Sequence, residues 1–133
     1  MVGKDGQDGD VTGLDFCESN PNVVLRVGNE RGGPFRGAHS ADNGVSFTRF
    51  AKLPFATAHS GRIAISATDC QRAIWAPENA TAYLTVDGGQ TWQPSQGAPH
   101  SIISDRWNHT QPLASDRVSS ALFYLFLRGA FYG

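Results

Sequence analysis

The segment "TVDGGQTW", Thr85–Trp92, places an Asp-Gly-Gly turn between residues that favour β-strands. Gly89 can adopt the positive φ angle that a tight hairpin needs, and the Asp87 carboxylate can accept hydrogen bonds from the backbone N–H groups that follow it. The Thr85 hydroxyl can bond to the same loop, and the Trp92 ring can be buried beneath it. These properties predict a structural β-hairpin and disfavour Asp87 as a catalytic acid.

The same pattern occurs earlier in the chain, in "SADNGVSF", Ser40–Phe47. Asp42 and Asp87 are 87 − 42 = 45 positions apart, and two strand-like segments precede each turn. A third copy follows, with "QPLASD" as its first strand, "LFYLFL" as its second and "GAFYG" as the start of its third. A repeat of about 40–50 residues with four strands is typical of a β-propeller blade.

We therefore predict an all-β fold, a partial β-propeller of four-stranded antiparallel blades with these hairpins. The predicted parts are a polar N-terminal end at 1–10, a first blade at 11–55, a second blade at 56–100, and an inter-blade loop with a truncated third blade at 101–133. A β-sandwich is the alternative, but it does not explain why the same turn residues recur. Open sheet faces and edges predict that the isolated chain is unstable or self-associates.

Composition narrows the classes of partner and ligand. A length of 133 residues suits one domain, and a formal net charge of −1 argues against nucleic acid. No segment reaches the roughly eighteen consecutive apolar residues of a membrane span. One carboxylate per turn cannot supply the six to eight or so oxygen ligands of Ca²⁺, so we expect no metal site, and no cofactor is indicated. Cys17 and Cys70 lack zinc-site spacing, and free buried thiols are favoured over a disulfide.

Both turns resemble the Asp-box (BNR) repeat, a structural hairpin between the outer two strands of a propeller blade. The flanking segments resemble glycoside hydrolase family 74, the xyloglucanases, in the same order. They are "TGLDFCESNPNVVLRVG" (Thr12–Gly28), "GRIAISATD", "AIWAPENATAYLTVDGGQTW" and "QPLASDRVSSALFYLF". The likeness extends from Thr12 to Tyr132, which is most of the chain.

The resemblance implies two facing propellers with a polysaccharide between them, hydrolysed with inversion by two aspartates. Inversion needs one protonated and one ionised carboxyl about 6.5–9.5 Å apart, so that a water fits between base and sugar. The segment resembles blades downstream of a catalytic turn, so its catalytic residues are unknown and it is expected to be inactive alone. Asp10 in "GDVTG" resembles the general base only faintly, and a flexible end is favoured. The implied partners are the polysaccharide and the remaining blades, and the implied localisation is extracellular.

Trp107 and His109 are the predicted substrate-binding residues. They lie in "HSIISDRWNHTQP", a polar segment between the second and third units, and loops on a rigid scaffold often carry binding residues. Trp75 is predicted to pack within a blade. His59 and Arg62 flank the first strand of the second unit, where ligand loops of the family often lie, but surface polarity explains them equally well.

Two other Asp-box classes stay open as alternatives. A sortilin-like propeller would bind a peptide or protein without catalysis, and would be expected to carry a cysteine-rich module that is not visible in this sequence. A sialidase would need an arginine triad for a substrate carboxylate, and usually an early Arg-Ile-Pro segment, which "PFRG" is not.

Overall fold

The structure is a computed structural model that describes residues 11–29, 36–97, 113–127 and 130–132. These residues form three β-sheets and no helix. The first sheet contains β1 (Val11–Cys17), β2 (Asn20–Gly28), β3 (Gly37–Ser40) and β4 (Thr48–Arg49). The second contains β5 (Arg62–Ile65), β6 (Ala73–Ala76), β7 (Tyr83–Thr85) and β8 (Gln93–Pro94). The described part of the third contains β9 (Leu113–Ser115), β10 (Phe123–Leu127) and β11 (Ala130–Tyr132).

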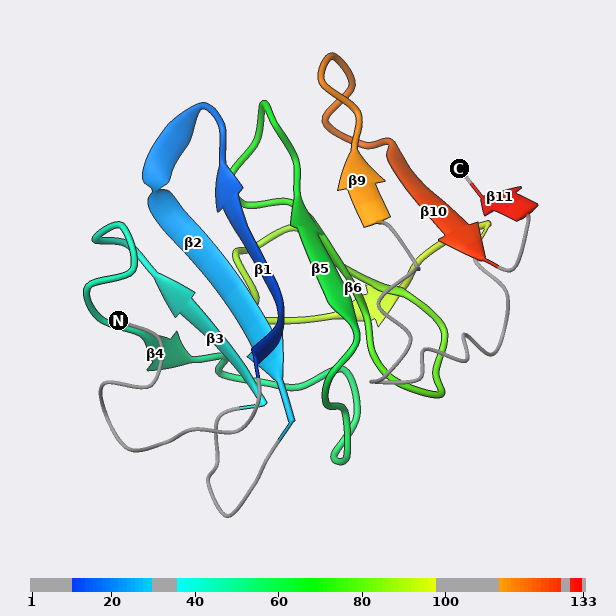
Figure 1. Ribbon diagram of the computed structural model, residues 1–133, viewed down its shortest axis with the longest axis horizontal. Helices are drawn as coiled ribbons and strands as arrows, with labels where there is room; N and C mark the ends of the chain where they lie inside the picture. Colours follow the sequence, from blue (N-terminus) through cyan, green and yellow to red (C-terminus); the bar gives the residue numbers. More distant parts are fainter. Residues whose placement is uncertain (1–10, 30–35, 98–112, 128–129, 133) are drawn as a thin grey trace.

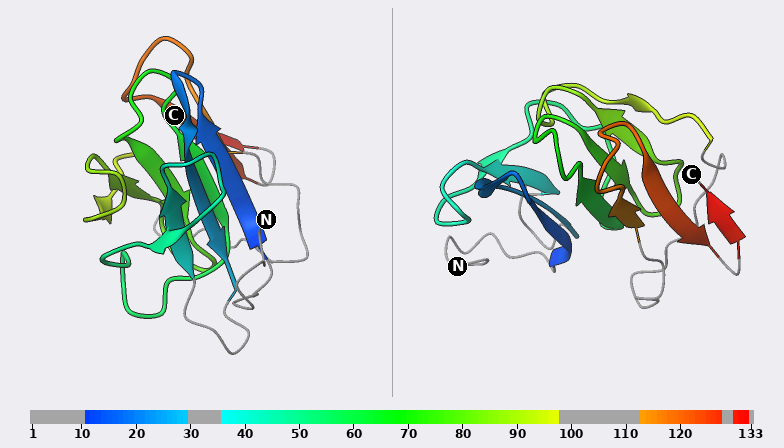
Figure 2. Two further views of the ribbon diagram at one scale, coloured as in Figure 1. Left: turned by 90° about the vertical axis from the view of Figure 1, so that its left-hand side faces the viewer. Right: turned by 90° about the horizontal axis from the view of Figure 1, so that it is seen from above.

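Within each sheet the strands follow one another in chain order, and all paired neighbours are antiparallel. The three sheets lie side by side (Figure 1), with the inner strands β1, β5 and β9 next to one another. The view from above shows the outer strands of the first two sheets extending away from these inner strands (Figure 2). This arrangement confirms the predicted all-β class and the four-stranded antiparallel sheets. None of the described residues forms a helix long and apolar enough to cross a bilayer.

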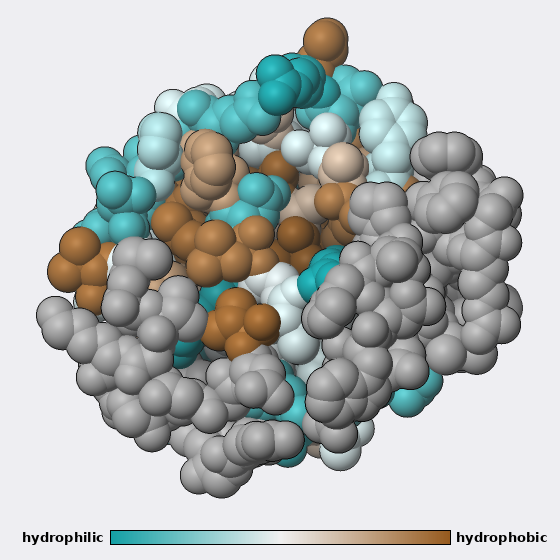
Figure 3. Space-filling model, viewed as in Figure 1, coloured by the Kyte–Doolittle hydropathy of each residue, from teal (hydrophilic) through white to brown (hydrophobic). Residues whose placement is uncertain are grey.

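The main hydrophobic core lies between the first and second sheets. Leu25 and Val27 from β2 meet Ile65 and Trp75 from the second sheet, and all four are at most 1% exposed. The Trp75 ring also packs against Phe50, at 6.0 Å between ring centroids. The prediction that Trp75 packs in the core is therefore confirmed, but this core lies between two sheets and not within one. Apolar side chains also gather in the middle of the molecular face that carries β1 and β5 (Figure 3).

A second apolar cluster joins the second and third sheets. Ala64 and Ile74 supply it from β5 and β6, and Phe123 and Leu125 supply it from β10. Successive residues of a strand point to opposite faces, so β5 and β6 serve both interfaces at once. The alternating use of Ala64 and Ile65 explains why β5 after Arg62 and all of β6 are apolar.

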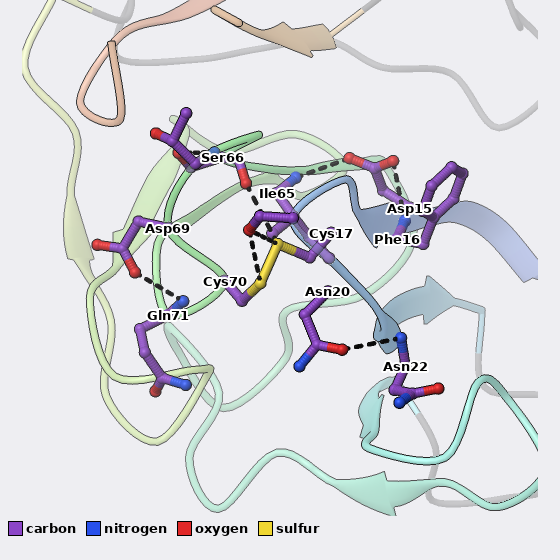
Figure 4. The surroundings of a disulfide bond; sticks show 12 residues. Asp15, Phe16, Cys17, Asn20, Asn22, Ile65, Ser66, Asp69, Cys70 and Gln71 are labelled. Carbon is purple, nitrogen blue, oxygen red and sulfur yellow. Dashed lines mark hydrogen bonds between the residues drawn. A yellow bond between two sulfur atoms is a disulfide. The ribbon is translucent and has the colours of Figure 1, made fainter. Parts of the chain in front are cut away.

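Cys17 and Cys70 form a disulfide, with a Cα–Cα distance of 5.5 Å, so the prediction of free thiols is wrong. The bond connects the end of β1 to the turn between β5 and β6 (Figure 4). The prediction failed because stacking of the first two sheets brings the β1–β2 and β5–β6 hairpin ends together, although the two cysteines are 53 positions apart in sequence. The Ser19 hydroxyl lies 3.3 Å from the Cys17 sulfur and 3.4 Å from the Cys70 sulfur.

Polar contacts also tie the inner strands β1 and β5 together. The Ile65 N–H donates to Asp15 Oδ2 at 2.7 Å, and the Phe16 N–H donates to Asp15 Oδ1 at 2.9 Å. Burial raises the pKa of the Asp15 carboxyl above its ordinary value, although both backbone hydrogen bonds oppose the change. The Arg62 guanidinium donates to the Thr12 carbonyl. Asp15 and Arg62 therefore act as links between sheets.

Candidate functional site

The two aspartate turns form the same hydrogen bonds. In the first turn, the Ser40 hydroxyl donates to Asp42 Oδ1 at 2.7 Å and accepts the Gly44 N–H at 2.9 Å. Asp42 Oδ1 also accepts the Ser46 N–H at 2.9 Å, and the Ser46 hydroxyl donates to Asp42 Oδ2. These bonds from Ser46 and Ser40 lower the pKa of Asp42 to about 2.

In the second turn, the Thr85 hydroxyl donates to Asp87 Oδ1 at 2.8 Å and accepts the Gly89 N–H at 2.8 Å. Asp87 Oδ1 accepts the Thr91 N–H at 2.9 Å. Desolvation raises the pKa of Asp87, but hydrogen bonds from Thr91 and Thr85 outweigh it and leave the pKa below its ordinary value. A carboxylate held ionised by its own turn is a poor general acid, so both aspartates are structural.

Asp42→Asn is expected to make stability less sensitive to acid. The native pKa of about 2 lies below the ordinary value of about 3.9, so ionised Asp42 stabilises the fold above pH ~4. This contribution is lost as the pH falls through about 2. The variant should melt below the unchanged protein at pH 7, with a gap that narrows from pH 4 and closes near pH 2. Thermal unfolding followed by circular dichroism measures the gap, and a constant gap across this range contradicts the assignment.

The end of the second sheet where β5 begins and β6 ends carries a polar pair. His59 Nε2 lies 3.4 Å from Glu78 Oε2, and His59 Nδ1 lies 2.8 Å from the Thr57 carbonyl oxygen. The Glu78 N–H donates to the His59 carbonyl at 3.1 Å. These contacts hold the turn before β5 against the turn after β6. The His59 side chain, 37% exposed, can therefore meet a ligand in a fixed orientation.

The backbone beneath this pair adopts sparsely populated conformations. Ser60, Gly61 and Asn79 have φ angles of 54°, 78° and 57°. A Cβ on Gly61 would lie 1.8 Å from the Ala76 carbonyl oxygen, so only glycine fits this close crossing of the two turns. The Trp75 indole N–H donates to the Ser60 carbonyl at 2.8 Å and anchors the crossing in the core. Strained residues of this kind are concentrated at functional sites.

The predicted site residues are only partly placed. Trp107, His109 and Asp10 lie outside the described residues. His59 lies beside Glu78 at the end of the sheet, whereas Arg62 is used to join the inner strands. Sequence reasoning missed Glu78. A usable signal was present, because Glu78 is an acidic residue directly after the apolar segment "AIWAP". The end of β6 pairs with the start of β5, so a residue at this point lies near His59.

No family model matches the chain. A xyloglucanase from Paenibacillus sp is 30% identical over 123 residues, which cover 90% of this chain and 11% of that protein. The GH74 xyloglucanase structure from Xanthomonas campestris matches with a TM-score of 0.66 and 32% identity, over 85% of this chain and 15% of that chain.

A GH74 enzyme structure from Niastella koreensis has a TM-score of 0.65 at 22% identity, covers 86% of this chain and 14% of that one, and supports the fold alone. The chain thus spans 11% to 15% of the length of these three relatives. The matches nonetheless cover nearly all of this chain, in sequence and in structure. The chain is therefore a homologue of the glycoside hydrolase family 74 xyloglucanases and corresponds to a part of their β-propeller structure.

Proposed function

We propose that the chain is part of a hydrolase that degrades xyloglucan with inversion, and that it contributes polysaccharide contacts and not the catalytic pair. The observation that carries the proposal is identity of 30% and 32% to two xyloglucanases over most of the chain. The structural roles of Asp15, Asp42 and Asp87 support the second part, because each carboxylate already accepts backbone N–H groups. On this proposal the isolated chain binds xyloglucan weakly and does not cleave it.

The proposed contacts are Trp107 and His109, with His59 as a further candidate. His59 precedes β5 by three residues, and Trp107 and His109 precede β9 by six and four residues. The aromatic faces of Trp and His can stack on the apolar faces of sugar rings, and their polar N–H groups can bond to hydroxyls. One end of neighbouring inner strands would then present a row of contacts along a polymer.

We further propose that the chain functions outside the cell. The Cys17–Cys70 disulfide supports this, because disulfides persist in secreted and periplasmic proteins and are rare in the cytosol. The proposal predicts that the bond forms after export, and that chain produced in a reducing compartment contains free thiols.

Affinity electrophoresis in gels with and without xyloglucan tests the binding. The chain should be retarded by xyloglucan, and Trp107→Ala should weaken binding on the order of tenfold, because it removes the ring proposed to stack on a sugar. Arg117→Ala is a suitable control because Arg117 is 81% exposed and lies at the other end of β9. Equal migration of the unchanged chain in both gels contradicts the binding proposal, and release of reducing ends from xyloglucan contradicts the inactivity of the chain alone.

A further inference from the structure

The two ring nitrogens of His59 both face oxygen atoms. Nδ1 lies 2.8 Å from the Thr57 carbonyl oxygen, and Nε2 lies 3.4 Å from Glu78 Oε2. A carbonyl oxygen only accepts hydrogen bonds, so the short contact to Thr57 places a proton on Nδ1. In the neutral imidazole Nε2 is then an acceptor, and it lies beside a carboxylate that is also an acceptor. Neutral His59 and ionised Glu78 therefore present two hydrogen-bond acceptors side by side.

The fold does not depend on this pair of side chains. The turns that carry it are held by the backbone, because the Glu78 N–H donates to the His59 carbonyl at 3.1 Å and the Trp75 indole N–H donates to the Ser60 carbonyl. The side chains of His59 and Glu78 are 37% and 19% exposed, and ion pairs that water can reach stabilise proteins only slightly. Accessible side chains on a fixed backbone meet the requirement of a binding site.

Two arginines also lie at the turn before β5, and both donate to backbone carbonyls. Arg36 Nη1 donates to a carbonyl of this turn at 2.8 Å, and the Arg62 guanidinium donates to the Thr12 carbonyl. Of the charged side chains in the described part of the chain, the one in an ion pair with the His59 ring is that of Glu78. Imidazoles change charge between about pH 5 and pH 8, so the charge of His59 decides whether this pair is closed.

We propose that Glu78 is a substrate-binding residue that acts with His59, the two side chains accepting hydrogen bonds from adjacent hydroxyl groups of one sugar. This inference rests on the proposed function and adds the ligand group that the end of the second sheet recognises. Sugar rings carry neighbouring O–H donors, and bonds to an ionised acceptor are stronger than bonds between neutral groups. Protonation of His59 turns Nε2 into a donor that bonds to Glu78, so the pair of acceptors is lost. Xyloglucan binding therefore weakens in acid.

Affinity electrophoresis at about pH 5 and about pH 8, each against a gel without xyloglucan, tests the pair. The unchanged chain should bind on the order of tenfold more weakly at the acid pH. Glu78→Gln and His59→Gln should each weaken binding on the order of tenfold at the higher pH and remove most of the pH dependence. Glu18→Gln, the same substitution at a 47% exposed position after β1, should change neither. His109→Gln should lower the affinity and keep the pH dependence.

The outcomes separate this inference from the proposed function. Retardation that is equal at both pH values, full binding by Glu78→Gln, or a pH dependence that is lost in His109→Gln and kept in His59→Gln overturns the inference and leaves the proposed function standing. Absence of retardation at both pH values overturns the proposed function and the inference with it.

Imidazole nitrogen chemical shifts test the acceptor pair without any polysaccharide. At about pH 8 the proton of neutral His59 should be on Nδ1, and the resonance is identified by its loss in His59→Gln. A proton on Nε2 would remove the acceptor beside Glu78 and would refute the inference whatever the gels show. Addition of xyloglucan at the same pH should shift the Nε2 resonance of the unchanged chain, and an unmoved Nε2 resonance in a chain that is retarded would count against it equally.

Discussion

Replacing Trp75 with alanine is expected to lower the free energy of unfolding by about 3–5 kcal/mol, the range for deletion of a buried aromatic side chain. The Trp75 side chain is 0% exposed, and its ring centroid lies 6.0 Å from that of Phe50 and 5.6 Å from that of Trp92. The substitution also removes the indole N–H that bonds to the Ser60 carbonyl. It therefore opens a cavity between the sheets and loosens the crossing beneath His59.

Thermal unfolding should show this loss as a decrease in midpoint of about 10–20 °C for a domain of this size. Trp75→Phe keeps an aromatic ring and loses the N–H, so it should fall between the alanine variant and the unchanged chain. Val86→Ala, at a half-exposed position, is the control for a small surface change. A midpoint for Trp75→Ala within a degree or two of the unchanged chain would show that the core between the sheets is not formed by this residue.

Loss of the Cys17–Cys70 disulfide is expected to lower the free energy of unfolding by about 4 kcal/mol in the chain-entropy model, for a loop of this length. The bond restricts an unfolded chain over a separation of 53 residues, and Cys17 is also 0% exposed. The double variant Cys17→Ala, Cys70→Ala keeps small apolar side chains and removes the cross-link, together with the two sulfur atoms near the Ser19 hydroxyl. Its effect should therefore be close to that of reduction.

Melting curves with and without a reducing agent measure the effect. The unchanged chain should lose stability on reduction, whereas the double alanine variant should be equally stable under both conditions. Mass spectrometry after alkylation should count no free thiol before reduction and two after it. Unchanged melting of the native chain after complete reduction would contradict the expected stabilisation.

Sequence reasoning predicted the sheets because the local signals and the fold agree. The spacing of Ser40, Asp42 and Gly44, repeated at Thr85, Asp87 and Gly89, encodes a turn in which the Ser40 and Thr85 hydroxyls bond to residues of their own turn. The strands β5 and β6 of the second sheet are short, mainly apolar segments between turn residues, and both sheet faces bury them. Such short-range patterns can be recognised in the sequence without knowing which distant residues are neighbours in the folded structure.

The features that sequence reasoning missed depend on the stacking of the sheets. Nothing around Cys17 or Cys70 marks them as partners, because their proximity arises only when the β1–β2 hairpin packs beside the β5–β6 turn. The bond from Arg62 to Thr12 has the same origin. The approach of Glu78 to His59 arises instead from the pairing of β5 with β6 within the second sheet. Contacts between sheets join residues that are distant in sequence, so no short sequence pattern predicts them, whereas hairpins are formed by neighbouring residues with recognisable patterns. The substrate contacts Trp107 and His109 stay a prediction.

The position of the disulfide has a consequence for how this scaffold can vary. It joins the sheets at the end where β1 finishes and the β5–β6 turn lies, whereas His59 and Glu78 lie at the opposite end, before β5 and after β6. The covalently fastened end maintains the alignment of neighbouring sheets. Connections at the other end are thus free to differ in length and chemistry between related chains, and they are the natural places to graft new recognition loops.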